Sequence, residues 1–301
     1  MELAWVERLR GEREMELLGD DAAVWGGKVF TVDMLTEGVD FILSEVATEL
    51  IGRKSLAVNL SDIAAMGAVP EAALVAVSLP RGDSDKNLLL AEKLYSGMKP
   101  LLEKYNVKII GGDTNCWDDG LVISVTVIGS VLPQGVFKRA GAKANDAILV
   151  TGELGGSILS HQFIFEPRIF EAIYLNQNHS IHAGIDISDG LAIDLHRVAK
   201  ESNLGTIIYA DAIPISRDAS ICTKKSGRLP IEHALSDGED FELILAVPED
   251  EATKLIESQP LLDRFGCRLS KIGKFTTDKN IRIVNKNGTI EKLEPLGFQH
   301  G

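Results

Sequence analysis

The chain has 301 residues, 45% of them hydrophobic and 25% charged, and its formal net charge is −13. This composition supports a sizeable core divided over about two domains and argues against global disorder. So acidic a chain lacks the basic face that nucleic acids and anionic membranes require, and an anionic ligand would need metal ions as intermediaries.

The three cysteines are far apart and form no CxxC pair, which argues against a zinc ribbon or a thioredoxin-like site and suits a reducing cytosol. No apolar run reaches about 18 residues, the length that a membrane helix needs. Residues 1–19 carry many charges and no apolar signal-peptide region. We therefore expect a cytoplasmic protein without a membrane span.

The first half of the chain alternates between strand and helix patterns. The expected elements are a strand at 28–34, a helix at 46–66, a strand at 72–79, a helix at 84–105, and strands at 107–110 and 121–128. Leu56, Leu60 and Ile63 give the first helix one apolar stripe, and Gly67 suits its C-terminal end.

The second half continues the same rhythm. We expect strands at 147–150, 184–187, 206–209 and 241–247, a helix at 191–202 and a surface loop at 224–228. In this helix the leucines point inward, while Asp194 and Arg197 point outward. The pattern predicts a fold class between α/β and α+β, with two layers and domains at 1–135 and 136–301.

Acidic residues recur at strand or helix edges beside glycine or another small residue. They are Asp20, Asp21, Asp33, Asp62, Asp113, Asp186, Asp189, Glu239 and Asp240. A carboxylate buried among apolar strands is costly unless it is paired or bound to a cation. Mg²⁺ prefers such oxygen ligands together with phosphates. The pattern predicts a magnesium and polyphosphate site if the fold gathers these residues.

Each of these residues also has an ordinary structural interpretation. Asp189 suits the N-cap of the helix that follows it, while Asp113 and the pair at 20–21 suit polar turns. Asp62 lies near the apolar stripe of its helix, which is unusual for a solvated aspartate. The chain has neither a Walker A loop nor the protein-kinase motifs. The glycines of 152–156 fit either a phosphate-contacting turn or a bare turn.

The acidic residues belong to short motifs whose order along the chain is informative. These motifs occupy 19–23, 32–38, 57–68, 110–114, 139–143, 150–152, 185–191 and 238–243. On these motifs the chain resembles the thiamine-monophosphate kinases, within the superfamily of aminoimidazole ribonucleotide synthetase, selenophosphate synthetase and the hydrogenase-maturation dehydratase. The segment Asn-Leu-Ser-Asp-Ile-Ala-Ala-Met-Gly-Ala at 59–68 is specific at the superfamily level, and 185–191 favours the thiamine-phosphate branch.

The resemblance implies a fold and a reaction. The fold would be an N-terminal α/β domain whose strands join a dimer barrel, followed by an α+β domain, in a homodimer with ATP near the subunit interface. The reaction would move the γ-phosphoryl group of ATP onto thiamine monophosphate in the presence of Mg²⁺. Neither a nucleic acid nor a membrane would be a partner.

The resemblance also assigns ligands residue by residue. The Mg²⁺ ligands would be Asp21, Thr31, Asp33, Asp62, Asp113, Asp186 and Asp189. The catalytic residues among them would be Asp33, Asp62 and Asp113. The residues in contact with ATP would be Gly112, Asp113, Arg139 and Ser188. The acceptor site would contain Asp40, Glu239 and Phe298. An aromatic ring such as Phe298 can stack on a flat heteroaromatic ring.

The chain departs from the family pattern mainly on the acceptor side. Asp40 stands where the family usually has histidine, Val32 where it has threonine, and Asp237 where glycine is typical. Two other functions therefore stay open: a superfamily enzyme that activates an amide or carbonyl oxygen, and a non-catalytic protein that binds nucleotide or thiamine phosphate. Selenophosphate synthesis is disfavoured, because no cysteine lies near residues 19–21.

Overall fold

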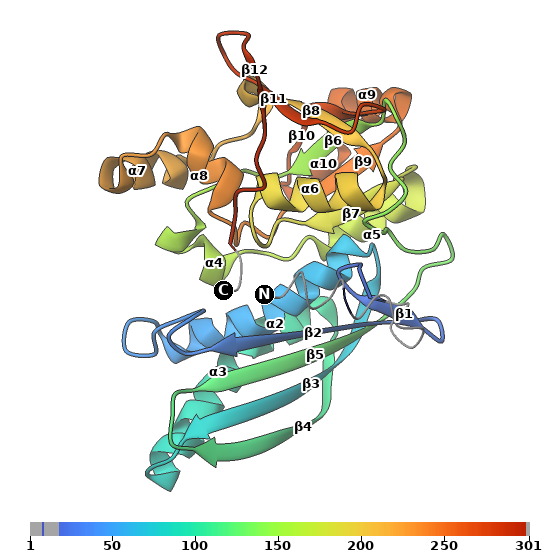
Figure 1. The fold of residues 1–301 in the computed structure, drawn as a ribbon. Coiled ribbons are helices and arrows are strands. Elements are labelled where there is room, and N and C mark those ends of the chain that lie inside the picture. Colours follow the sequence, from blue (N-terminus) through green and yellow to red (C-terminus); the bar gives the residue numbers. More distant parts are fainter. Residues whose placement is uncertain (1–7, 9–17, 299–301) are drawn as a thin grey trace.

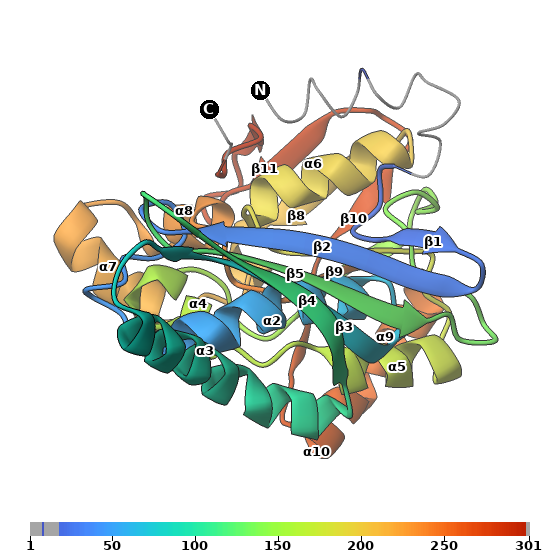
Figure 2. The same ribbon diagram turned by 90° about the horizontal axis from the view of Figure 1, so that it is seen from below.

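Two β-sheets organise the described part of this computed structural model, which is residue 8 and residues 18–298. The first sheet has the strand order β1-β2-β5-β3-β4, in which β3 and β4 run parallel and the other neighbours antiparallel. Its strands are β1 (Ala23–Trp25), β2 (Lys28–Thr36), β3 (Val69–Pro80), β4 (Lys108–Trp117) and β5 (Val122–Ser130). One face of this sheet carries α2 (Thr48–Ala65) and α3 (Ser84–Tyr105) (Figure 2).

The second sheet has the order β12-β11-β8-β10-β6-β9-β7, and β11 and β8 are its parallel pair. Its strands are β6 (Ala147–Thr151), β7 (Ala183–Asp186), β8 (Gly205–Tyr209), β9 (Leu243–Val247), β10 (Leu269–Thr276), β11 (Ile281–Val284) and β12 (Ile290–Lys292). The accompanying helices are α4 (His161–Ile164), α5 (Ile169–Asn178), α6 (Leu191–Glu201), α7 (Arg217–Ser226), α8 (Pro230–Ser236), α9 (Glu249–Ser258) and α10 (Pro260–Phe265). Two mixed α and β layers of this kind confirm the expected fold class.

Helix α2 lies between the first sheet and the second domain (Figure 1). It contacts β2, β5 and α3 on one side and α4, α5 and β7 on the other. The expectation of a single apolar stripe is therefore wrong, because the helix is buried on nearly every side from Ile51 to Ala65. A helix that packs between two layers must bury its polar side chains as well, and these need partners inside the protein.

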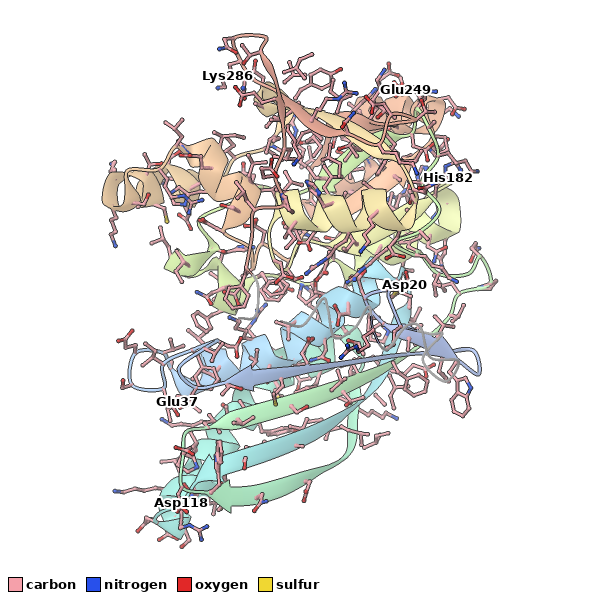
Figure 3. The ribbon with its side chains drawn as sticks, viewed as in Figure 1. Asp20, Glu37, Asp118, His182, Glu249 and Lys286 are labelled. Atoms are coloured by element: carbon pink, nitrogen blue, oxygen red, sulfur yellow. The ribbon has the colours of Figure 1, made fainter. Side chains whose placement is uncertain are left out.

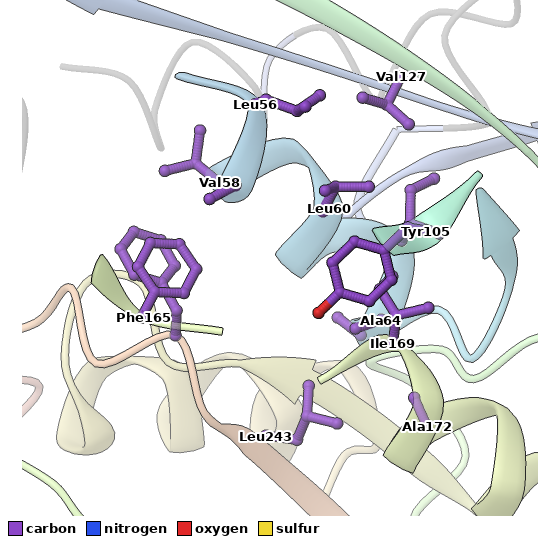
Figure 4. Packing of buried hydrophobic residues seen from close by; sticks show 14 of the residues in the cluster. Leu56, Val58, Leu60, Ala64, Tyr105, Val127, Phe165, Ile169, Ala172 and Leu243 are labelled. Carbon is purple, nitrogen blue, oxygen red and sulfur yellow. The ribbon is translucent and has the colours of Figure 1, made fainter. Parts of the chain in front are cut away.

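One hydrophobic core joins the two domains. Leu56 and Leu60 of α2 pack in the same buried cluster as Ile169 of α5 and Leu243 of β9 (Figure 4). A second cluster, built around α6 and the inner strands β6 and β9, lies within the second domain. The shared core fixes α2 relative to β7 and so fixes the side chains at their junction.

The side-chain alternation of the first sheet separates two groups of residues. Thr31 and Asp33 of β2 point toward α2, whereas Val32 and Met34 point to the opposite face and are each 63% exposed. Leu74 of β3 is exposed on that same outer face. The outer face therefore combines apolar side chains with exposure to solvent over the described residues.

Most expected elements are present with ends shifted by a few residues, but one strand differs in extent. The strand expected at 107–110 continues as β4 to Trp117. Gly111 and Gly112 pair with Leu74 and Val75 of β3, so the two glycines do not end the strand. The interpretation of Asp113 as part of a turn is wrong, because it lies inside β4.

Two expectations about the second domain are also wrong. The loop expected at 224–228 begins within α7, which ends at Ser226 before Gly227 in a left-handed conformation. Asp194 of α6 was expected to point outward and is fully buried. Its Oδ2 atom accepts hydrogen bonds from the backbone N–H groups of Asp189 and Gly190, both at 3.1 Å, which explains why a carboxylate faces inward.

Among the described residues, no helix combines the length and the apolar character that crossing a membrane would require.

The close contact between α2 and α3 generates a stability prediction. A Cβ atom on Gly97 would lie 1.8 Å from the carbonyl oxygen of Glu49, and one on Gly52 would lie 2.0 Å from that of Leu94. Alanine normally favours a helix over glycine by about 1 kcal/mol, but here the helices must separate. We expect Gly97→Ala to lower the free energy of unfolding by about 2 kcal/mol, as overpacked cores do.

Urea titration followed by circular dichroism measures this loss. The control is Gly82→Ala, because a Cβ atom there meets nothing within 4 Å. Equal stability of the two variants would contradict the close helix packing.

Candidate active site

Three carboxylates from separate parts of the chain meet where the two domains face each other. Asp21 precedes β1, Asp62 lies in α2 and Asp186 ends β7. One oxygen of each carboxylate lies within 4.8 Å of the others. The side chain of Asp21 is 1% exposed and Asp186 is 2% exposed, so little water remains to screen these charges. Figure 3 shows the adjacent Asp20 at this junction, whereas Asp118 and Lys286 lie toward opposite ends of the molecule.

Hydroxyl groups from β2 and α2 hold this carboxylate cluster of Asp21, Asp62 and Asp186. Thr31 Oγ1 donates a hydrogen bond to Asp62 Oδ2. Ser61, the residue before Asp62 in α2, donates from Oγ to Asp186 Oδ2 at 2.6 Å. A single turn of α2 therefore contributes one carboxylate and orients a second, which comes from the other domain.

Asp33 adds a fourth negative charge beside the cluster. Its backbone N–H donates to the side-chain oxygen of Asn59 in α2 at 3.2 Å, which fixes β2 against the helix. Desolvation raises the pKa of Asp62 well above its usual range, and the carboxylates of Asp33, Asp186 and Asp21 raise it further. Burial followed by repulsion from Asp21 also raises the pKa of Asp186 well above its usual range.

Arg139 forms an ion pair with one oxygen of Asp21 and leaves the other oxygen of this carboxylate without a hydrogen bond. Its Nε and Nη2 atoms donate to Asp21 Oδ1 at 3.1 and 2.5 Å, and its backbone N–H donates to Asp20 Oδ1 at 2.9 Å. The other oxygen of Asp21, Oδ2, is buried and accepts no hydrogen bond from the described residues. An unpartnered buried oxygen beside two further carboxylates suits a hard cation, so these residues fit Mg²⁺.

The loop between β7 and α6 places Ser188 and Asp189 next to the carboxylate cluster without joining it. Asp189 Oδ2 accepts a hydrogen bond from Arg197 Nη2 at 2.5 Å. The interpretation of Asp189 as a helix N-cap is wrong: Gly190 occupies that position, and Asp194 accepts the loop N–H groups instead. Ser188 accepts a hydrogen bond through its carbonyl oxygen from the backbone N–H of Glu239 at 2.7 Å.

Gly112 and Asp113 lie apart from the cluster within the chain. They belong to β4, the edge strand on the far side of the first sheet from β1 and β2. Asp113 is the register partner of Ala76, which in turn is level with Ser124 and Met34. Its side chain therefore lies on the outer face with Met34. Asp33 points to the opposite face, which α2 covers with Asp62.

Two of the expected acceptor residues converge on the loop that follows β7. Glu239, whose backbone is left-handed with φ 56°, is bound to Ser188 as described above. Phe298 donates its backbone N–H to the carbonyl oxygen of Asp189 at 3.0 Å, and its side chain is about half exposed. The C-terminal segment thus presents an exposed aromatic ring beside this loop.

Asp40, the third expected acceptor residue, uses its carboxylate within its own turn. Its Oδ2 atom accepts a hydrogen bond from the backbone N–H of Thr36 at 2.7 Å. Burial raises the pKa of Glu239, and repulsion from Asp40 and Asp189 raises it further, while Lys54 lowers it. The Asp40 carboxylate therefore lies close enough to Glu239 to raise the pKa of its side chain.

The glycine turn at 152–156 is not arranged as an anion site among the described residues. The N–H of Gly155 donates to Asp240 Oδ1 at 2.8 Å, and that of Gly156 donates to Asp237 Oδ2 at 3.2 Å. Because carboxylates already accept these N–H groups, the interpretation as a bare turn fits better than a phosphate-contacting one. The Asp237 that departs from the family pattern serves this turn.

Sequence reasoning missed several polar residues that support the site. Asn59 and Ser61 lie in the quoted motif, and Lys54 precedes it by one turn, yet none was assigned a role. All three are buried in α2. Their signal was available in the sequence, since polar side chains that interrupt an apolar helix segment need internal partners.

Family models match both halves of the chain. The AIR synthase related protein N-terminal domain matches residues 19–131, and the AIR synthase related protein C-terminal domain matches residues 143–286. The chain is 39% identical to the thiamine-monophosphate kinase of Rhodopirellula baltica over 319 aligned positions, which cover 100% of this chain and 98% of that protein. It is 32% identical to the thiamine-monophosphate kinase of Bacillus subtilis, with 94% and 92% covered.

Solved structures give the same result for the fold. A structure described as AaThiL complexed with AMPPCP and TMP is similar to this chain with a TM-score of 0.85 at 26% identity, covering 100% of this chain and 97% of the other. A HypE–HypF complex structure matches with a TM-score of 0.79 at 20% identity, covering 97% and 98%, and so shares the fold. The expected two-domain, aminoimidazole-ribonucleotide-synthetase-like fold is confirmed.

The carboxylate cluster predicts how the melting temperature depends on Mg²⁺ and pH. A raised pKa means that folded Asp62 and Asp186 keep protons that the unfolded chain releases, so their contribution to stability is lost as pH rises from about 4 through the raised values. Because Mg²⁺ binds the carboxylate form, we expect it to raise the melting temperature more at about pH 8 than at about pH 5.5.

Asp62→Asn relieves the repulsion and removes one ligand. It should raise the metal-free melting temperature at about pH 8 and weaken the response to Mg²⁺. Asp118→Asn, at an exposed ion pair with Arg81, is the control and should behave like the wild type. A wild-type response to Mg²⁺ that is absent, or equal at both pH values, would contradict metal binding by the cluster.

Proposed function

The chain belongs to the thiamine-monophosphate kinase family, and from this premise we propose that it transfers the γ-phosphoryl group of ATP to the phosphate of thiamine monophosphate. A bond forms between an acceptor phosphate oxygen and the γ-phosphorus, and the bond from that phosphorus to the β–γ bridging oxygen breaks. The products are ADP and thiamine diphosphate. The observation that carries the proposal is the carboxylate cluster of Asp21, Asp62 and Asp186, at the position of the family motifs.

The main obstacle to this reaction is repulsion between two polyanions. It amounts to about 4 kcal/mol per pair of unit charges at ~4 Å and an effective dielectric of ~20. When bound, Mg²⁺ neutralises this charge and stabilises the in-line transition state. Asp21, Asp62 and Asp186 would hold such ions, with Thr31, Asp33 and Asp189 beside them.

The remaining residues orient the substrates. The acceptor oxygen is already anionic near neutral pH, so the reaction requires no strong general base. Arg139 lies next to Asp21, and its guanidinium would donate hydrogen bonds to phosphate oxygens. Ser188 would contact ATP from the loop after β7. On the acceptor side, Glu239 offers a carboxylate to the cationic half of thiamine, and Phe298 offers a ring for stacking.

Asp40 suits the acceptor site better than its charge alone suggests. Its carboxylate is engaged by Thr36, so it stabilises the turn next to Glu239 and need not approach the acceptor phosphate. A negative charge at this position is compatible with a thiazolium cation. The departure from the family histidine therefore does not favour a different acceptor.

We also propose that the protein acts as a homodimer. The outer face of the first sheet exposes Val32, Met34 and Leu74, and β4 is an edge strand whose outer side pairs with no other strand of the described residues. A second copy would cover this apolar face and bring Gly112 and Asp113 of β4 to the subunit interface. That arrangement would give these residues a route to ATP, which the single chain does not provide.

The cytoplasm is the compartment that we propose for this activity. The three cysteines are free thiols, which suits a reducing compartment where ATP is available.

Acceptor-dependent ADP release tests the proposed reaction. Wild-type protein with Mg²⁺ should release ADP in proportion to added thiamine monophosphate, and EDTA should stop the reaction reversibly. Asp62→Asn should stay folded and retain less than about a tenth of the wild-type rate, a loss above ~1.4 kcal/mol of transition-state stabilisation. Asp118→Asn should keep full activity.

The outcomes separate the competing functions. ADP release that ignores thiamine monophosphate would indicate another acceptor, and ATP binding without turnover would indicate a non-catalytic protein. Full activity of Asp62→Asn would remove this residue from the metal site.

Light scattering during gel filtration tests the dimer. Wild-type protein should elute with twice the chain mass of 32.6 kDa. Met34→Asp places a charge on the outer face and should shift the mass toward one chain. Leu88→Asp, on exposed α3, is the matched control and should leave the dimer intact. A wild-type monomer would contradict the proposed assembly.

A further inference from the structure

Lys54 is a buried cation to which the proposed mechanism gives no role. Lys54 lies in α2 and its side chain is completely buried. Its Nζ atom donates to the carbonyl oxygen of Asp40 at 3.2 Å, to Gln162 Oε1 at 2.8 Å and to Glu239 Oε1. The ring centroid of Phe163 lies 5.0 Å from the same atom. All three ammonium hydrogens therefore have acceptors, as a fully desolvated charge requires.

These partners come from three segments that are distant in the sequence. Asp40 belongs to the turn after β2, Gln162 to α4, and Glu239 to the loop before β9. Asp40 and Glu239 are expected acceptor residues; Asp40 lies in the first domain, whereas Glu239 and Gln162 lie in the second. Lys54 is thus the point at which the two halves of the acceptor region are tied to α2.

Lys54 also sets the orientation of Glu239. The Glu239 side chain is one-third exposed, and its Oε1 atom is bound to Lys54. Among the contacts of the described residues, its Oε2 atom has no hydrogen-bond donor and remains available to a ligand. The backbone of Glu239 is left-handed at φ 56°, a conformation that a non-glycine residue keeps only when its surroundings hold it.

The charges around Glu239 also indicate that Lys54 holds this side chain in place. The carboxylates of Asp40 and Asp189 lie near enough to Glu239 to repel it, and Lys54 is the cation that offsets them. Asp189 is paired with Arg197, whereas Lys54 is the cation that pairs with Glu239. Without Lys54, Glu239 would keep the repulsion from Asp40 and Asp189 and lose this ion pair. The loop carrying Glu239 would then have an electrostatic reason to move away.

We propose that Lys54 is a positioning residue for the phosphoryl acceptor: it fixes Glu239 and the Asp40 turn so that one oxygen of Glu239 faces the cationic half of the acceptor. This inference rests on the proposed function, because it assumes that Glu239 contacts the acceptor. Among the described residues, none of the groups assigned to ATP (Gly112, Asp113, Arg139 and Ser188) makes a hydrogen bond to Lys54. Ser188 contacts Glu239 through backbone groups, whereas Lys54 binds the Glu239 side chain. The loss of Lys54 should therefore change the KM for the acceptor more than the KM for ATP.

Steady-state kinetics with both substrates varied provides the test. Lys54→Met removes the charge and keeps much of the buried volume. We expect the KM for thiamine monophosphate to rise by about tenfold or more, as for a lost hydrogen bond to a charged group, with the KM for ATP within about twofold of wild type. Lys104→Met is the matched control, because Lys104 also joins the domains through an ion pair, with Glu166, and is exposed.

A double variant separates positioning from general stability. If Lys54 acts through Glu239, then Glu239→Gln alone should raise the acceptor KM, and adding Lys54→Met should raise it little further. If Lys54 had only a structural role, the effects of the two substitutions on the acceptor KM would multiply in the double variant, or the KM values for thiamine monophosphate and ATP would change equally. If Lys54→Met fails to fold, as judged by its melting transition, Lys54→Gln and Gln162→Leu carry the same prediction.

The kinetic experiment has three possible outcomes. An acceptor KM that rises alone and is not raised further in the double variant supports the inference. Wild-type turnover with an unchanged acceptor KM in folded Lys54 and Gln162 variants overturns the inference and leaves the proposed function intact. No acceptor-dependent turnover by the wild type overturns both.

Discussion

Mutual repulsion among buried carboxylates is the constraint on which the rest of this structure depends. Asp21, Asp62 and Asp186 approach within 4.8 Å with little access to water, and Asp33 lies beside them. Such an arrangement opposes folding, and the chain sustains it only because the shared hydrophobic core holds α2 between the first sheet and β7. The site is therefore strained electrostatically before any ligand binds, and a divalent cation relieves that strain.

The burial of α2 explains why structure and site are so closely connected. One helix carries four of the residues that build the site. Lys54 binds Glu239 on the acceptor side, Asn59 binds β2 and Ser61 binds Asp186 at the end of β7. Asp62 belongs to the carboxylate cluster itself. The close approach of α3 at Gly52 and Gly97 leaves α2 little freedom to shift. A rigid central helix can hold opposed charges at fixed distances, which a surface loop cannot.

Local patterns in the sequence were sufficient for the elements that have clear periodicity. Helices α2, α3 and α6 lie within a few residues of their predicted ranges, and the carboxylates that cluster were among those singled out. No element beyond β9 was predicted, although α9 and β10 follow it. What failed depended on tertiary contacts. Asp194 has the spacing of a solvated residue, but it is buried because it accepts hydrogen bonds from the N–H groups of the preceding loop. Asp113 follows two glycines as a turn residue would, but it lies in a strand because β4 pairs with β3. For Lys54 the sequence indicates only that a polar side chain interrupts an apolar helix and needs a partner; the partners themselves are 14, 108 and 185 residues away and follow only from the fold.

The most direct test of the central claim is a crystal structure grown with Mn²⁺ and an unreactive ATP analogue, with the metal located by anomalous scattering. The account predicts a peak coordinated by Asp21, Asp62 and Asp186, with Arg139 released from Asp21 toward the phosphates. An anomalous map with no peak at these carboxylates, or with metal bound only elsewhere, would contradict it.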